Sequence, residues 1–275
     1  MFRLFLHELR ARRNGIIGWG IGLSLLPMMY VGLYPDFAEQ MEGMQELLEL
    51  PIYQAMGMSM TTFEAYAAST TTNMIPVILS IYAVISGTGT LAGEEEDGRL
   101  ELIVALPIPR WQIVTVKAAA MSIAIFVILL VASAGAAATL VGIEGQVETA
   151  VSPLDFGLSL MAAWPLVIAI GMISLFLGAF ASRRRIASII AAVIIVVSYF
   201  GNNLAGMIES LEALQPFFLF HYFDATETGI IDGQAMGDVL LLTAVAVISF
   251  GLALFFFQRR DITVGAWPWT KAKIA

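Results

Sequence analysis

The residues best suited to chemistry stand together in one short charged stretch between two long apolar runs. The stretch GEEEDGRLELIVALPIPRWQIV begins at Gly93 and opens with four consecutive acids, Glu94, Glu95, Glu96 and Asp97. Four carboxylates are more than the favourable N-terminal end of a helix requires. We therefore expect them to pair with bases of a partner or of this chain. The candidate bases in the chain are Arg12, Arg13, Arg110 and Arg183 to Arg185.

Two other groups of residues suggest chemistry less strongly. Met56, Met58 and Met60 alternate in MGMSM, and thioethers favour Cu(I), although methionine more often fills gaps in packing. His221 stands in the aromatic run PFFLFHYF, where it is either a proton or metal group or a structural residue. A copper site and a purely structural role therefore both stay open for these residues.

The motifs of several enzyme classes are missing from the sequence. It has no G-x-x-x-x-G-K-[ST], no H-E-x-x-H and no G-x-S-x-G, and it contains no cysteine. We therefore expect no catalytic residue, bound metal or cofactor in this chain, and any ATP and Mg²⁺ to be bound by a partner.

Six long apolar runs determine the fold class. The sequence of 275 residues is 59% hydrophobic and only 13% charged. Runs of about 18 or more apolar residues predict membrane-spanning helices. The predicted spans are Ile16 to Tyr34, Ala67 to Ala92, Val114 to Val141, Phe156 to Ala181, Ile186 to Ile208 and Val239 to Phe257. We expect one all-α transmembrane domain over residues 1–275, whose spans carry no charge except Lys117.

The basic residues predict the orientation of these spans. Of the 14 Lys and Arg residues, all but Lys117 at the start of the third span fall in the two tails and in the loops after the second and fourth spans, whereas the other loops contain Asp and Glu but no Lys or Arg. Because basic residues stay on the cytoplasmic side, both termini are expected in the cytoplasm, and the charged stretch forms a cytoplasmic loop over 93–113. The net charge of -8 averages two unlike faces and predicts no nucleic-acid partner.

Segments outside the spans are expected to lie along the membrane surface. Residues 1–14 place apolar and basic side chains on opposite faces, which predicts an interfacial amphipathic helix in contact with lipid. A simply solvated basic terminus is the alternative. The outer loop 209–238 carries an apolar aromatic run too short to span, which predicts a re-entrant or interfacial segment. We expect it to form an outer gate, with residues Pro216, Phe217, Phe218, His221 and Tyr222.

Small and hydroxyl residues within the spans predict close contacts between helices. Gly18 and Gly22 form a G-x-x-x-G pair, the pattern with which membrane helices approach closely, within a chain or across a dimer. Hydroxyls such as Ser86, Thr88 and Thr90 either line a path or form hydrogen bonds between helices, and the second use is the commoner.

The charged stretch also resembles a known family. It is similar to the E-x-x-x-G-T-L-E-x-x-x-x-x-P-[IV]-x-R segment after the second span of ABC transporter type-2 permeases, which have six spans. The matching residues are Glu94 to Glu96, Gly98, Leu100, Glu101, Leu102, Pro107, Arg110 and Lys117. Arg99 replaces the usual threonine. In this family the loop is a coupling helix that enters a cleft on a separate ATPase.

The resemblance implies a function for the whole chain. It implies the permease subunit of an ATP-driven exporter in the cytoplasmic membrane, paired with a second permease in a homodimer or heterodimer and with ABC ATPase subunits. Coupling to the ATPase would involve residues 94–102 together with Pro107 and Arg110. The uncharged spans suggest an amphiphilic substrate, such as a drug, an antibiotic or a lipid. The alternatives are a copper- or ion-handling permease and a membrane scaffold without transport.

Overall fold

The six predicted spans are present in a computed structural model that describes residues 2–42, 62–100, 108–181 and 183–259. All regular elements within these ranges are helical. The helical runs long and apolar enough to cross a membrane are Phe2–Gln40, Phe63–Glu96, Arg110–Ile143, Pro153–Phe180, Arg184–Met207 and Met236–Arg259. The predicted fold class, an all-α integral membrane protein with six spans, is confirmed.

The elements follow one another without any sheet in the described residues, and several spans consist of more than one helical piece. In chain order they are α1 Phe2–Glu42, α4 Phe63–Ala67, η1 Ala68–Thr72, α5 Met74–Thr88, η2 Gly89–Gly93, α6 Glu94–Glu96, α8 Arg110–Ile143, α9 Pro153–Met161, α10 Trp164–Phe180, α11 Arg184–Met207, η3 Glu209–Phe217, η4 Leu219–Tyr222, α12 Glu227–Ile231 and α13 Met236–Arg259. Of the four η elements, η1 and η2 are π-helical turns and η3 and η4 are 3₁₀ helices.

The first helix is longer than the apolar run that predicted it. Of the segment 1–14, expected to form an interfacial helix, residues 2–14 belong with the first span to one continuous helix, α1. Pro27 and Pro35 lie inside α1 without ending it, which is common in membrane helices because neighbouring groups satisfy the freed carbonyls. The consequence is that polar residues near the N-terminus are rigidly connected to the first span.

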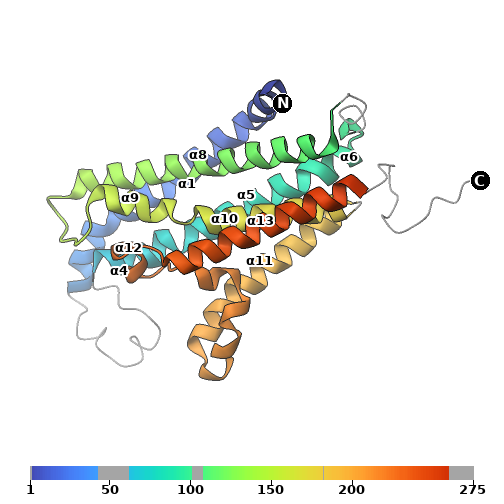
Figure 1. Cartoon of the computed structure of the whole chain (residues 1–275). Helices are drawn as coiled ribbons and strands as arrows, with labels where there is room; N and C mark the ends of the chain where they lie inside the picture. The colour runs from blue at the N-terminus through green and yellow to red at the C-terminus, as the bar shows by residue number, and fades with distance from the viewer. Residues whose placement is uncertain (1, 43–61, 101–107, 182, 260–275) are drawn as a thin grey trace, which may run out of the picture.

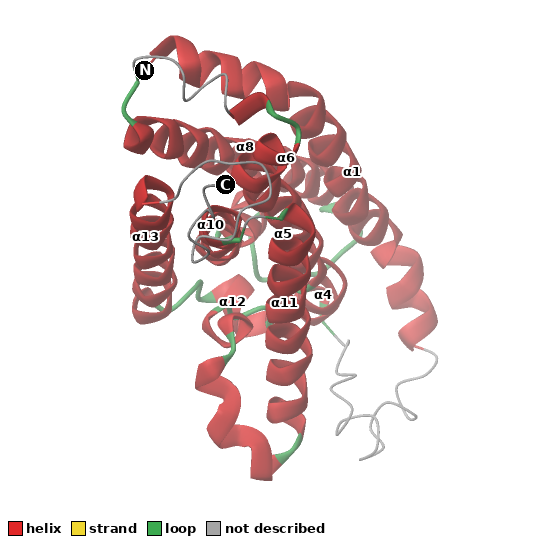
Figure 2. Ribbon diagram, turned by 90° about the vertical axis from the view of Figure 1, so that its right-hand side faces the viewer, coloured by secondary structure: helices red, strands yellow, loops and turns green. Residues whose placement is uncertain are grey.

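The helix α10 lies at the centre of the bundle. It packs against α5 on one side and α13 on another, and it also contacts α8 and α11, while α1 runs along α8 (Figures 1 and 2). The helices α5 and α10 approach each other closely at Gly87, where an added Cβ would lie 2.7 Å from Ser174 Cβ and 2.8 Å from the carbonyl oxygen of Gly171. Only glycine allows these two backbones to come so close.

After α11 the chain projects from the bundle (Figure 1). The segment η3 turns back beside the end of α11, and together they project from the bundle as the orange part of Figure 1. At the opposite end of the molecule lie the start of α1, the helix α6 and the last turn of α13 (Figure 1). The charged segment therefore lies near the N-terminal end of the chain.

Candidate functional site

The four consecutive acids end the second span and begin a sharp turn. Glu94, Glu95 and Glu96 form α6, and the N–H of Asp97 donates to the carbonyl oxygen of Gly93 at 3.0 Å. Gly98 then takes a φ of 69°, a left-handed conformation that favours glycine. A new helix starts at Arg99. Arg99 and Leu100 belong to the segment in which a coupling helix is expected, and Glu101, Leu102 and Pro107 lie outside the described residues.

The side chains of these acids point in different directions. Glu94 and Glu95 are turned toward the protein, whereas Glu96 and Asp97 are exposed. A carboxylate oxygen of Glu96 accepts the backbone N–H of Arg184 at 2.8 Å, which joins the acids to the start of α11. Two of the acids do form ion pairs within the chain, Glu94 in the interior and Asp97 at the surface, but their partners are Lys117 and Arg99, which were not among the bases expected.

The interior part of the pairing centres on Lys117, near the start of α8. Its side chain is completely buried, with 0% exposure. The ammonium donates to Glu94 Oε1 at 2.7 Å and Oε2 at 2.8 Å, and to Glu8 Oε1 at 2.7 Å. We call Lys117, Glu8 and Glu94 the buried charge cluster. Because a buried charge without a partner is far more costly than a paired one, these three residues hold each other in place.

Arg12 extends the buried charge cluster toward the second span. One turn after Glu8, its guanidinium lies 4.0 Å from the Glu8 carboxylate. It also donates to the hydroxyls of Ser86 and of Thr90, the latter at 2.6 Å. These hydroxyls therefore bond between helices, as expected of hydroxyls in membrane spans. The helix α1 is consequently joined to α5, to η2 and, through Lys117, to α8.

The surface part of the acidic segment remains open to other molecules. Asp97 and Arg99 form an exposed ion pair beside the left-handed turn. Hydrogen bonding to Asp97, and next the charge of Asp97, raise the pKa of the Arg99 guanidinium above its already high ordinary value. Arg99 therefore keeps its positive charge at any physiological pH.

Leu100 and Arg110, two further predicted coupling residues, take up unlike positions. Leu100 is only 1% exposed and belongs to the hydrophobic core, so it anchors the new helix to the bundle rather than offering a contact outward. Arg110 is the first residue of α8 and is partly exposed. Of the predicted coupling residues that the structure describes, Glu96, Asp97 and Arg99 present the most exposed side chains.

The predicted gate residues lie in the two 3₁₀ helices at the other end of the molecule. The hydroxyl of Tyr222 donates to the carbonyl oxygen of Pro216 at 2.7 Å, which closes this segment on itself. Phe218 packs on Gly201 of α11, where an added Cβ would lie 2.5 Å from the ring. Phe217 is 82% exposed, and His221 is also exposed. The predicted gate is thus a compact unit resting on α11.

Several buried polar residues were missed because the apolar runs end before the helices do. We expected Lys117 to be the only charged residue within the spans, and this expectation is wrong. The spanning helices include Glu8, Glu64 and Glu94. The sequence did carry a signal, since a single lysine within an apolar span requires a partner, and such residues are rarely left unpaired.

Glu64 is a further buried acid, at the end of the molecule opposite the buried charge cluster. It is 4% exposed, and its Oε1 accepts the hydroxyl of Thr149 at 2.7 Å and the backbone N–H of Ala150 at 2.6 Å. These hydrogen bonds join the start of the second span to the loop between α8 and α9. Tyr34, Phe63 and other aromatic rings pack around this point.

The copper or metal alternative rests on the three methionines of MGMSM and on His221. Among the described residues, no group of three or more His, Asp or Glu side chains is arranged to hold a metal ion. Met56, Met58 and Met60 lie outside the described residues.

The six apolar helices define a multi-pass membrane protein. Comparison with known families identifies the class to which it belongs. The family model for the ABC-2 family transporter protein matches residues 3–262. The chain therefore belongs to the ABC-2 family and is a membrane subunit of an ABC transporter. Membership implies association with an ABC ATPase subunit. A comparison with curated proteins gave no match.

Proposed function

We propose that this chain is the permease subunit of an ATP-driven exporter for an amphiphilic substrate such as a drug, an antibiotic or a lipid. It resides in the cytoplasmic membrane with both termini in the cytoplasm. ATP and Mg²⁺ are bound by the ATPase subunit, which docks on the segment 93–113. The observation that carries the proposal is the buried charge cluster, because it connects this segment to helices that cross the membrane.

The buried charge cluster provides a route for force from the ATPase. A push on the exposed residues after Glu94 displaces the end of the second span. Lys117 and Glu8 follow Glu94, because separating Glu94 from Lys117 would leave a buried carboxylate without its cation. The helices α1 and α8 therefore move with the second span as one unit, as a change between inward and outward openings requires.

The proposed orientation is supported by where the bases meet. Arg12 and Lys117 reach the second span at the end that carries α6, and Arg184 packs there on Gly93, whose added Cβ would lie 3.1 Å from the arginine Cδ. Bases from three segments far apart in sequence thus gather at one end. A cytoplasmic location for this end agrees with the tendency of basic residues to stay inside.

The second permease subunit is proposed to face α11. This helix exposes large apolar side chains at helical spacing along its length, namely Ile186, Ile189, Val193, Val196, Val197, Phe200 and Leu204. A path between two permeases would run past α11, and the unit Pro216 to Tyr222 that rests on α11 is then placed to act as an outer gate.

The proposal is tested by co-purification with the ABC ATPase subunit whose gene lies nearest to that of this chain. The wild-type chain should retain the ATPase and stimulate its hydrolysis of ATP. Reversing the exposed charges with Asp97→Arg and with Arg99→Glu should reduce both several-fold. Glu144→Arg, an equal reversal at an exposed site at the opposite end, is the matched control and should change neither. Retention unaffected by all three variants would contradict docking on this segment.

A further inference from the structure

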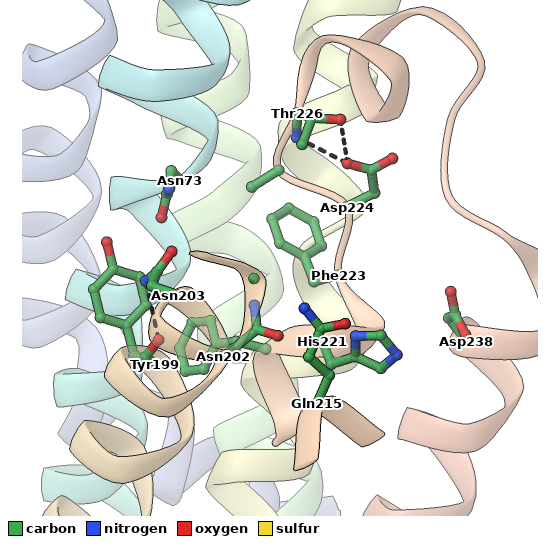
Figure 3. A pocket seen from close by; sticks show the side chains of 13 residues that line it. Asn73, Tyr199, Asn202, Asn203, Gln215, His221, Phe223, Asp224, Thr226 and Asp238 are labelled. Atoms are coloured by element: carbon green, nitrogen blue, oxygen red, sulfur yellow. Dashed lines mark hydrogen bonds between the residues drawn. The ribbon is translucent and has the colours of Figure 1, made fainter. Parts of the chain in front are cut away.

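A cavity lies beside the proposed gate, and none of its walls belongs to the buried charge cluster. Its volume is about 450 Å³, within the range of about 300–1,000 Å³ typical of ligand pockets. The walls come from α11, η3, η4 and the loop that follows η4, with single residues from the second span and α13 (Figure 3). The residues that matter most below are Asn73, Asn202, Asn203, Gln215, Asp224 and Asp238.

Four amide side chains supply hydrogen-bonding groups to this outer pocket. Asn202 and Asn203 stand on one side and Asp238 on the other (Figure 3). The amide nitrogen of Asn203 donates to the carbonyl oxygen of Tyr199 at 2.9 Å, which leaves its own carbonyl oxygen available. No hydrogen bond joins the side chains of Asn73, Asn202 or Gln215 to other described residues. Each amide oxygen can therefore accept hydrogen bonds from a ligand.

Asp224 is held in a fixed position at the edge of the outer pocket. Its Oδ1 accepts the backbone N–H of Thr226 at 2.9 Å and the Thr226 hydroxyl at 2.5 Å. The side-chain amide of Gln234 forms two hydrogen bonds with the backbone of Asp224. It accepts the Asp224 N–H and donates to the Asp224 carbonyl oxygen, both at 2.7 Å. The helix α12 approaches so closely that an added Cβ on Gly229 would lie 2.1 Å from that carbonyl oxygen. The other carboxylate oxygen of Asp224 is left for a ligand.

The outer pocket has negative charge without a compensating base. In the described part of the chain, neither Asp224 nor Asp238 forms an ion pair, and the pocket lining contains no Lys or Arg. His221 is the one lining side chain of basic type. The pocket thus offers mostly hydrogen-bond acceptors and two carboxylates. A ligand with hydrogen-bond donors and positive charge satisfies both requirements.

We propose that the outer pocket binds the protonated amine of a cationic amphiphile. An ammonium group only donates hydrogen bonds, so it suits carboxylates and amide oxygens. The rings of Tyr199, Phe220 and Phe223, which also line the pocket, suit the adjoining apolar part and can face a cation. This inference rests on the proposed function, because it assigns the pocket to cargo near the outer gate.

The test measures binding of a fluorescent amine to the purified full chain in lipid nanodiscs without ATPase. The probe is dansylcadaverine, and its N-acetylated form is the neutral control with the same apolar part. Empty nanodiscs give the binding due to lipid. We expect saturable binding of the amine to exceed that of the acetylated probe by about tenfold in affinity, as loss of a charge-assisted hydrogen bond implies.

Substitutions in the outer pocket should remove this preference. Asp224→Asn keeps a side-chain oxygen that can accept the hydrogen bonds from Thr226. Asp238→Asn does not involve that contact. Weaker amine binding in both variants would therefore not result from one local rearrangement. Each should weaken binding of the amine by about tenfold and leave the acetylated probe unchanged. Asp232→Asn, an exposed acid outside the pocket, is the matched control and should have no effect.

The outcomes separate this inference from the proposed function. Equal binding of both probes, or unchanged binding in Asp224→Asn and Asp238→Asn, overturns the outer pocket as an amine site even if the ATPase co-purifies. Amine binding that depends on these acids in a chain that retains no ATPase overturns the proposed function instead.

Discussion

Lys117 and Glu8 form a salt bridge of 2.7 Å across 109 positions of sequence, between the start of α8 and the N-terminal part of α1. The lysine is fully buried and also binds Glu94, so one ammonium forms ion pairs with carboxylates from two other helices. This relationship makes the charged end of the bundle a single structural unit. It also determines which substitutions the protein tolerates least.

Replacing Lys117 by methionine should strongly destabilise the protein. The change keeps most of the side-chain volume but removes the cation from Glu94 and leaves Glu8 only the more distant guanidinium of Arg12. Breaking a buried ion pair costs about 3–5 kcal/mol in comparable cases. Thermal unfolding of the purified chain should show a much lower midpoint. Adding Glu94→Gln to Lys117→Met should recover part of the loss, because one of the uncompensated charges is removed. A midpoint unchanged in Lys117→Met would show that the cluster contributes nothing to stability.

Replacing Gly87 by valine should disrupt the contact of α5 with α10. The first added carbon already lies 2.7 Å from Ser174 Cβ, and backbone atoms of Gly171 and Leu175 lie within 3 Å, so the helices must separate. We expect a loss of monodisperse protein in size-exclusion chromatography. Gly18→Ala and Gly22→Ala are the controls, because nothing lies within 4 Å of an added Cβ at either position. If all three variants behaved alike, the packing at Gly87 would not be what matters.

Replacing Glu64 by leucine should loosen the loop between α8 and α9. The substitution removes the acceptor for the Ala150 N–H and the Thr149 hydroxyl, at a cost of about 1–3 kcal/mol. Hydrogen exchange of a peptide covering 146–152 should become faster. Glu64→Gln retains a side-chain oxygen and should exchange nearly as slowly as the wild type. Equal exchange rates in all three proteins would mean that the loop is held by other contacts.

Single cysteines should report the orientation directly, because the sequence contains no cysteine of its own. Asp97→Cys and Glu144→Cys replace exposed acids at opposite ends of the bundle. In intact cells, a maleimide that does not cross membranes should label the cysteine at position 144, and it should label that at position 97 only after permeabilisation. The reverse pattern would place both termini outside.

The spans could be predicted from sequence, but their ends and partners could not. Hydrophobicity identifies the segments that must cross hydrocarbon, and all six were found for this reason. A run of apolar residues stops at the first charge, whereas a helix continues as long as its backbone hydrogen bonds can form. Glu8 and Glu64 were therefore assigned to surface segments although they are buried within helices.

Contacts between helices depend on three-dimensional neighbours that a motif does not specify. Gly18 and Gly22 match a known packing pattern, yet both face open space within the described chain, while the tight contact occurs at Gly87. The outer pocket was not predicted, although His221 in its lining was named as a gate residue. Its acids and amides come from α11, η3, the loop after η4 and α13, and Asn73 comes from the second span more than a hundred residues earlier. Small size or polarity alone does not indicate which residues will meet.

The two π-helical turns before and after α5 change the directions in which side chains point along the second span. In an uninterrupted α-helix, Ser86 and Glu94 would point about 80° apart, since each residue advances by about 100°. The wider turn Gly89–Gly93 absorbs an additional residue and brings the two directions to within about 20° of each other. Arg12 and Lys117 can therefore reach them from the same side. A helical wheel with one fixed period misplaces this face, whereas deleting one residue from η2 would leave a regular α-helix in which Glu94 still lies within about 20° of Ser86.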